Sequence, residues 1–314
     1  MSQMGFYLLT LAIYASLNGI LVLGLDMQFG VTGIFNFAYI VLVAVGAYAT
    51  GIAALPPATA GGAQYIGGFG WAFPWDVLFG MGMTVLFSLG LAIIVFRRIA
   101  NWYLALTLSA IGWALFVLAT NYVPLLNGII GLTGVSGPGQ DTLDPATYQW
   151  VFLAIVLVSL AACFVVMWRV EGAPLGRALR STREDSVAAS SLGKSPVGLK
   201  TVGFLLGGAA AGLGGGLSII YLGGWSPGSW GSGETFVMLS AVIIGGRGWA
   251  AGAFLGSIIV LEAIIEGSRF FPDIGGRPDL LPALQSVAIG VLLLAVLWWR
   301  PFGLWPEPKT RFPK

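Results

Sequence analysis

Ionisable residues are rare in this 314-residue chain, at 9% of the total, and they are concentrated between Val170 and Lys200. This segment begins VEGAPLGRALRSTREDSVAASSLGK. Ser181 lies three residues before Glu184, and Thr182 lies three residues before Asp185. The spacing is that of a capping box, in which a hydroxyl and a carboxylate satisfy free N–H groups at the start of a helix. The chemistry open to these residues is therefore helix capping and ion pairing with another protein.

The segment continues as a short helix. Small and apolar residues recur there at helical spacing, at Val187, Ala188, Ser191 and Leu192. Gly193 and Pro196 then predict the end of the helix. We expect a helix of about three turns. It is too polar to enter lipid and too small to form a core, so it must pack against another surface.

We predict that this segment docks onto a cytoplasmic partner. Charge pairs would set register and partner choice at such an interface, and the candidates are Arg180, Arg183, Glu184 and Asp185. Two alternatives are a helix lying on anionic lipid and a plain solvated loop. The acidic residues and the lack of large apolar side chains argue against the lipid surface, and the capping signals argue against the loop.

Metal and thiol chemistry has little support. The chain has no His and a single Cys, Cys163, which lies inside an apolar run. This composition argues against haem ligation, a structural disulfide and thiolate or imidazole metal sites. We predict neither a metal nor a cofactor.

The rest of the chain has the composition of a polytopic helical membrane protein. Hydrophobic residues make up 57% and the mean hydropathy is +0.89, above the values of a soluble domain. Runs of about 20 apolar residues can cross the hydrocarbon core as helices, and the uniform runs exclude the alternating strands of a barrel. The predicted spans are Phe6–Leu25, Thr32–Leu55, Trp75–Phe96, Trp102–Thr120, Tyr148–Trp168, Leu199–Leu222, Trp249–Ile265 and Leu281–Trp299, with a shorter segment at Phe236–Gly246. The many glycines of the sixth span predict close helix packing.

The basic residues predict the orientation. All of them except Arg247, Arg269 and Arg277 can lie on one side of the membrane if the spans alternate. The positive-inside rule makes that side cytoplasmic. We therefore expect one transmembrane domain over residues 1–314, a cytoplasmic coupling loop over 170–198 and a cytoplasmic tail over 301–314.

The orientation also constrains the segments Phe236–Gly246 and Trp249–Ile265. Glu234 faces outward, and the last span must begin outside, so the two segments must enter and return on the same side. About 11 residues are too few to cross the membrane. We expect a re-entrant or broken helix that turns at Gly245–Gly248, the alternative being two short, tilted spans.

The stretch Asp26–Gly33, DMQFGVTG, predicts a second interruption. Non-helical backbone at membrane depth survives only where protein or a water-filled cavity surrounds it, so two such segments indicate a substrate path between them. The alternative is a short loop at the surface. Thr32 and Asn36 have side chains suited to hydrogen bonds along the path, or to holding helices together.

Three ionisable residues are further candidates for the path. Glu262 and Glu266 are four residues apart and share one helix face. Ionisable groups within a span are functional candidates, although carboxylates near the outer end can simply be hydrated. Arg247, at the predicted turn, could meet a substrate carboxylate or neutralise one of the glutamates.

Four blocks of sequence, in order along nearly the whole chain, resemble the branched-chain amino acid permease family of ATP-binding-cassette transporters (LivH/LivM type). The M-type subunit is the most similar. The blocks are GLDMQFGVTGIFNFAYIVLVAVGAYATG at Gly24–Gly51, GRALRSTREDSVAASSLG in the charged segment, ETFVMLSAVIIGGRGWAAGAFLG at Glu234–Gly256 and RPFGLWPEP at Arg300–Pro308.

The resemblance implies roles for part of the charged segment. The run VAASSLG is similar to the E-A-A-x-x-x-G motif of importer permeases, which places Ala188, Ala189 and Gly193 at the ATPase contact. Val187 stands where that motif has Glu. Tyr39 stands close to where family members often carry His.

The resemblance also implies partners. They are a second homologous permease subunit, two cytoplasmic ATP-binding subunits, an extracytoplasmic solute-binding protein and a small polar solute. No G-x-x-x-x-G-K-[ST] phosphate loop occurs in the sequence, so this chain is not the ATPase.

We therefore expect an all-α, polytopic transmembrane helical bundle with a cytoplasmic coupling helix and a re-entrant or broken helix pair. Its predicted function is that of an inner-membrane permease subunit, not an enzyme and not a nucleic-acid binder, that imports branched-chain amino acids or a similar small polar solute. Import of urea or short amides by the same machinery is one alternative. An ATP-independent transporter or channel, with Glu262 and Glu266 as ion sites, is another, and a membrane enzyme with an acid-only site is the third.

Overall fold

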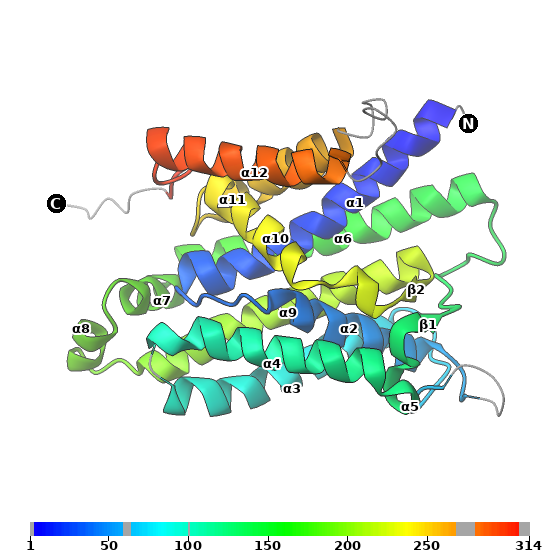
Figure 1. The fold of residues 1–314 in the computed structure, drawn as a ribbon, viewed down its shortest axis with the longest axis horizontal. Coiled ribbons are helices and arrows are strands. Elements are labelled where there is room, and N and C mark those ends of the chain that lie inside the picture. The colour runs from blue at the N-terminus through cyan, green and yellow to red at the C-terminus, as the bar shows by residue number, and fades with distance from the viewer. Residues whose placement is uncertain (1–2, 59–63, 100, 268–279, 308–314) are drawn as a thin grey trace.

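The computed structural model describes residues 3–58, 64–99, 101–267 and 280–307. Its architecture is a bundle of helices, as predicted (Figure 1). Six helices in these ranges are long and apolar enough to cross a membrane. They are α1 (Gln3–Asp26), α3 (Trp75–Arg98), α4 (Asn101–Asn121), α6 (Pro145–Gly172), α9 (Pro196–Leu222) and α12 (Leu280–Trp299).

Shorter elements complete the bundle. Those between or beside the long helices are η1 (Met27–Val31), α2 (Tyr39–Ala54), α10 (Ser232–Gly245), α11 (Ala250–Ser257) and η4 (Ile258–Glu266). Those at the ends of the bundle are α5 (Val123–Leu126), η2 (Gly128–Ile130), α7 (Pro174–Glu184), α8 (Ser186–Ser191), η3 (Pro227–Ser229) and the strands β1 (Leu132–Thr133) and β2 (Gly224–Trp225). The two strands pair antiparallel, with Leu132 opposite Trp225.

The two ends of the bundle differ in charge. Helices α7 and α8 project from one end, where the last turn of α12 also lies, whereas β1, β2 and α5 lie at the other end (Figure 1). The last turns of α3 and α6 carry Arg97, Arg98 and Arg169. We call the end formed by α7 and α8 the charged end.

Close glycine packing holds α2, α3 and α9 together, as the glycines of the sixth span predicted. A Cβ added to Gly46 of α2 would lie 2.5 Å from Cα of Gly212 in α9. A Cβ on Gly212 would in turn meet the side chain of Thr84 in α3 at 2.7 Å. With little hydrophobic driving force between helices in lipid, such backbone contact is a main source of association.

The predicted break at Asp26–Gly33 is wrong in position. Helix α1 continues directly into the π-helix η1, and the non-helical stretch comes later, at residues 32–38. The N–H of Thr32 donates to the carbonyl of Met27 at 3.2 Å. This i→i+5 bond is that of a π-helix, so the backbone stays helical through the polar residues that follow α1. Asp26, Gln28 and Thr32 are all buried, so the alternative of a surface loop is wrong as well.

The predicted turn at Gly245–Gly248 is confirmed. Helix α10 ends at this turn, and α11 returns beside it, since a Cβ on Gly245 would lie 2.1 Å from the carbonyl of Gly252. With 14 residues, α10 is roughly 21 Å long, too short to cross by itself. Residues 223–231, which contain β2 and η3, bring the chain to the start of α10, where Trp230 packs against Phe116 with ring centroids 5.4 Å apart.

The charged segment forms two helices, not one that starts at Ser181 or Thr182. Helix α7 already begins at Pro174, a residue favoured in the first turn because it needs no N–H partner there. Ser181 and Thr182 therefore lie inside α7, where both hydroxyls donate to the carbonyl of Ala178. The two predicted capping boxes are wrong, because Asp185 itself caps the next helix, α8.

Candidate functional site

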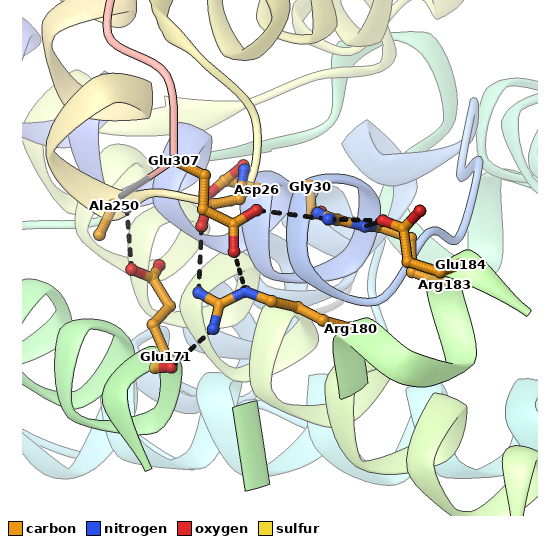
Figure 2. A network of polar contacts seen from close by, with 9 residues as sticks. Asp26, Gly30, Glu171, Arg180, Arg183, Glu184, Ala250 and Glu307 are labelled. Carbon is orange, nitrogen blue, oxygen red and sulfur yellow. Dashed lines mark hydrogen bonds and ion pairs between the residues drawn. The ribbon is translucent and has the colours of Figure 1, made fainter. Parts of the chain in front are cut away.

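The face of α7 that packs on the bundle carries two arginines. Leu179 and Thr182 are buried on this face. Arg180 and Arg183 point in the same direction, and only 20% and 16% of their side chains are exposed (Figure 2). The sequence predicted a partner interface for both arginines. In the structure their side chains point toward the rest of the chain.

Each arginine reaches a different part of the bundle. Arg180 donates to the carbonyl of Glu171 at 2.9 Å and to that of Gly248 at 3.4 Å. Arg183 donates to the carbonyl of Gly30 in η1. Both arginines also pair with Glu307 near the end of the chain. The interactions link α7 to α6, to η1 and to the turn between α10 and α11 (Figure 2).

Two buried carboxylates hold that turn from the other side. Asp26 accepts a hydrogen bond from the N–H of Gly248 at 2.7 Å. Glu171 accepts one from the N–H of Ala250 at 3.2 Å, at the start of α11. A carboxylate at a helix start satisfies a free N–H group and interacts favourably with the helix dipole. The two interruptions are thus in direct contact, because Asp26 immediately precedes η1 and Gly248 belongs to the turn.

Helix α8 presents an exposed apolar surface at the charged end. Asp185 caps it by accepting from the N–H groups of Val187 and Ala188 at 2.8 and 3.0 Å. The side chains of Val187 and Leu192 are 72% and 78% exposed. These exposed apolar side chains on a polar segment make α8 a candidate docking surface.

The other predicted coupling residues surround this surface. Glu184 is exposed and pairs with Arg183 at 2.8 Å. Ala189 is buried, so its face of α8 packs on the bundle. Gly193 has φ +78°, a left-handed conformation that favours glycine and ends the helix, as the sequence predicted.

Thr32 and Asn36, predicted along the path, make their hydrogen bonds within the protein. The hydroxyl of Thr32 donates to Met27 at 2.8 Å. The amide of Asn36 donates to Gln28 at 2.9 Å, and Gln28 donates to the carbonyl of Phe204 in α9 at the same distance. These bonds fix the non-helical stretch before α2. Those of Thr32 and Asn36 stay within residues 27–36, and only Gln28 reaches another long helix. Gln28 was missed as a member of this group.

The remaining predicted path residues are dispersed. Arg247 lies at the predicted turn and is exposed beside the charged end, because the turn that carries it reaches α7. Glu262 is buried in η4 and accepts from the amide of Asn18 in α1 at 2.9 Å. The side chain of Glu266 lies outside the described residues.

A cavity of about 450 Å³ lies where α4 meets the non-helical residues 32–38 and the segment 226–231, which contains η3. Its walls are mainly aromatic and aliphatic: Phe37, Ala38, Ile40, Val41, Ser109, Gly112, Trp113, Phe116, Trp230, Gly231 and Phe236. Phe37 stacks on Phe236 with centroids 5.2 Å apart, and the N–H of Ile40 donates to the hydroxyl of Thr235 at 3.1 Å. The volume is that of a typical small-molecule site.

A bundle of membrane-length helices, with broken segments beside a cavity and a short helix exposed at one end, defines a multi-pass membrane transport protein. Residues 7–297 match the family described as "Branched-chain amino acid transport system / permease component", and the chain belongs to this family. It is thus a permease component and not itself an enzyme. This agrees with the resemblance found in the sequence.

The chain is similar to several proteins of this family. It is 27% identical to the probable branched-chain amino acid transport permease protein LivM of Methanocaldococcus jannaschii, over 91% of this chain and 89% of that protein. It is also 27% identical to the high-affinity permease protein LivM of Escherichia coli, over 93% of this chain and 68% of that protein. Identity to the permease protein BraD of Pseudomonas aeruginosa is 24%, over 94% and 93% of the two chains. No solved structure matches the chain.

Three acidic residues at the charged end were missed as site residues. Asp26 and Glu171 are carboxylates at the ends of apolar runs, and that position was the only signal in the sequence. Glu307 lies in the predicted tail, where basic residues surround it in the sequence. Residues 301–307 are not a free tail, because Leu304 and Trp305 donate to carbonyls of α10.

Proposed function

We propose that this chain is the membrane-spanning permease subunit of an ATP-driven importer of branched-chain amino acids. Membership of the permease family and the names of its relatives in Escherichia coli and Methanocaldococcus jannaschii support the solute class. The observation that carries the coupling to an ATPase is α8, a capped helix that exposes Val187 and Leu192 beyond the bundle.

The energy source in this proposal is a separate subunit. The run Gly193-Lys194-Ser195 does precede helix α9, but helix α8 stands where a phosphate loop requires a strand. Two ATP-binding subunits would contact α8 of this chain and the equivalent helix of a second permease subunit. A solute-binding protein would deliver the solute at the opposite end.

The charged end faces the cytoplasm in this proposal. Arg97, Arg98, Arg169 and the arginines of α7 all lie at this end, which the positive-inside rule assigns to the cytoplasm. An ATP-binding subunit is cytoplasmic as well. It can therefore reach α8 only in the orientation that places the charged end in the cytoplasm. The protein would reside in the inner membrane.

We place the apolar part of the solute in the cavity beside α4. Its aromatic and aliphatic walls suit a branched aliphatic side chain, and Ser109, the hydroxyl-bearing residue among them, donates its hydrogen bond to Ala105. Urea or a short amide would leave its polar groups without partners against such walls, at a cost of roughly 1–3 kcal/mol for each group. The lining therefore favours an amino acid with an apolar side chain.

Reconstitution tests this function directly. The chain is placed in liposomes with its second permease subunit and its ATP-binding subunits, and uptake of labelled leucine is measured with binding protein outside and ATP inside. Uptake is expected only with ATP and all subunits present. Full-rate uptake by the chain alone, without ATP, would refute the proposal and favour a channel or secondary transporter.

A further inference from the structure

Beyond the docking surface, the charged end contains a cluster of charges that the transport function by itself does not require. Asp26, Glu171, Arg180, Arg183 and Glu307 come from α1, α6, α7 and the segment after α12 (Figure 2). The cluster connects α7, which leads directly into the docking helix α8, to both interruptions of the bundle.

The segment after α12 is attached to the turn between α10 and α11. The N–H of Leu304 donates to Ile244, and that of Trp305 donates to Gly245, both at 2.9 Å. These carbonyls belong to the last turn of α10 and have no partner within the helix. A Cβ on Gly246 would lie 2.0 Å from the carbonyl of Trp305, so the two backbones are in direct contact. The segment and the turn are therefore joined through their backbones.

Glu307 connects this attached segment to α7. One of its carboxylate oxygens pairs with Arg180 and the other with Arg183, the latter at 3.3 Å. Its side chain is 25% exposed, so the pairs are only partly screened by water. Arg180 and Arg183 are three residues apart on one helix face, which lets a single carboxylate hold both.

With Glu307 in place, each arginine is directed at one interruption. Arg183 donates to Gly30 of η1, and Arg180 donates to Gly248 of the turn. These backbone carbonyls are neutral, so they hold the arginines more weakly than a carboxylate does. Loss of the Glu307 carboxylate would leave Arg180 with its neutral carbonyl partners, and it would leave Arg183 with Glu184, whose side chain is 71% exposed. Arg183 would then be drawn toward water and away from η1.

We propose that Glu307 is a positioning residue for energy coupling. It holds Arg180 and Arg183 so that α7, η1 and the turn at Gly245–Gly248 move as one unit when a partner displaces α8. The proposal rests on the proposed function, since it assumes that a partner ATPase acts on α8. Glu307 contacts neither solute nor nucleotide in this scheme and acts through the two arginines alone.

The test is the ratio of leucine imported to ATP hydrolysed by the complete reconstituted transporter. In Glu307→Gln, which keeps the shape of the side chain and removes its charge, we expect the ratio to fall about tenfold, within the usual range of coupling between sites. ATP hydrolysis and the thermal midpoint should stay near those of the unchanged protein. Asp141→Asn, an exposed carboxylate change in the loop before α6, should leave the ratio unchanged. A ratio in Glu307→Gln equal to that of the control would overturn the proposal.

Two further variants keep the test decisive. If Glu307→Gln fails to assemble, Glu307→Asp retains the charge but shortens the reach by one methylene, and it should lower the ratio less. An unchanged ratio there overturns the proposal too. In a background with both Arg180→Gln and Arg183→Gln, changing Glu307 should have no further effect, and an additional loss would show that Glu307 acts elsewhere. Failure of the proposed function is distinct, because the unchanged transporter would then import leucine without ATP.

Discussion

Replacing the two exposed apolar residues of α8 by serine should weaken ATPase binding without damaging the fold. Full burial of a Val or Leu side chain is worth about 1.5–3 kcal/mol. Val187 and Leu192 are 72% and 78% exposed, so docking can still bury about three-quarters of each, or roughly 2–4 kcal/mol together. After the cost of ordering side chains at the interface, we expect a net loss of about 2 kcal/mol in Val187→Ser/Leu192→Ser, equivalent to roughly 30-fold in Kd.

The assay is the affinity of the detergent-purified chain for the ATP-binding subunit, measured by biolayer interferometry. Val123→Ser in α5, at the opposite end of the bundle, removes an apolar side chain that is 44% exposed and serves as the matched control. The control should bind as the unchanged chain does, and all three proteins should melt at the same temperature. Equal affinity of the double variant and the control would refute α8 as the docking element.

Three further predictions concern glycine conformation, helix packing and the cavity. Gly193→Leu forces a side chain into φ +78°, at a cost of about 1–2 kcal/mol. It should abolish ATP-dependent uptake and leave membrane insertion, measured by protease protection, unchanged. Normal uptake would contradict the role of this helix end. Gly46→Leu meets the backbone of Gly212 and should destabilise the bundle by about 1–3 kcal/mol, seen as a lower thermal midpoint, whereas Gly90→Leu has no heavy atom within 4 Å of its Cβ and should melt normally. Phe116→Ala enlarges the cavity and should raise the KM for leucine about tenfold with ATP hydrolysis retained, and an unchanged KM would place the solute elsewhere.

The order of spans could be predicted because it depends on local composition. A run of about 20 apolar residues crosses a membrane wherever it stands in the chain, and the predicted spans agree with the long helices within a few residues. Gly193 could also be predicted, since a left-handed helix end needs only one residue type. The capping boxes failed because Pro174 starts α7 before Ser181 is reached. A helix start is a competition between neighbouring signals, and the pattern S/T-x-x-E/D does not show which signal prevails.

The two arginines of α7 show what the pattern of charges could not reveal. On the sequence they are surface charges beside acidic residues, and a solvated or partner-facing position is the natural prediction. Their inward direction depends on Glu307, more than a hundred residues away, and on two backbone carbonyls that only the folded chain brings near. Asp26 and Glu171 meet the same turn for the same reason, because each bonds to an N–H that any residue type would offer.

The sequence by itself determined that this is a polytopic helical membrane protein, where its long helices lie, that one interruption falls at Gly245–Gly248 and to which permease family it is similar. These properties follow from hydropathy, chain length and residue-specific backbone preferences, all of which are local. Only the tertiary structure decided that the two interruptions meet and that Glu307 holds α7 to both of them. It also decided that an apolar cavity lies between α2, α4 and α10. Such contacts join distant segments through backbone atoms and partly buried charges, and their energies depend on geometry that no single stretch of sequence contains.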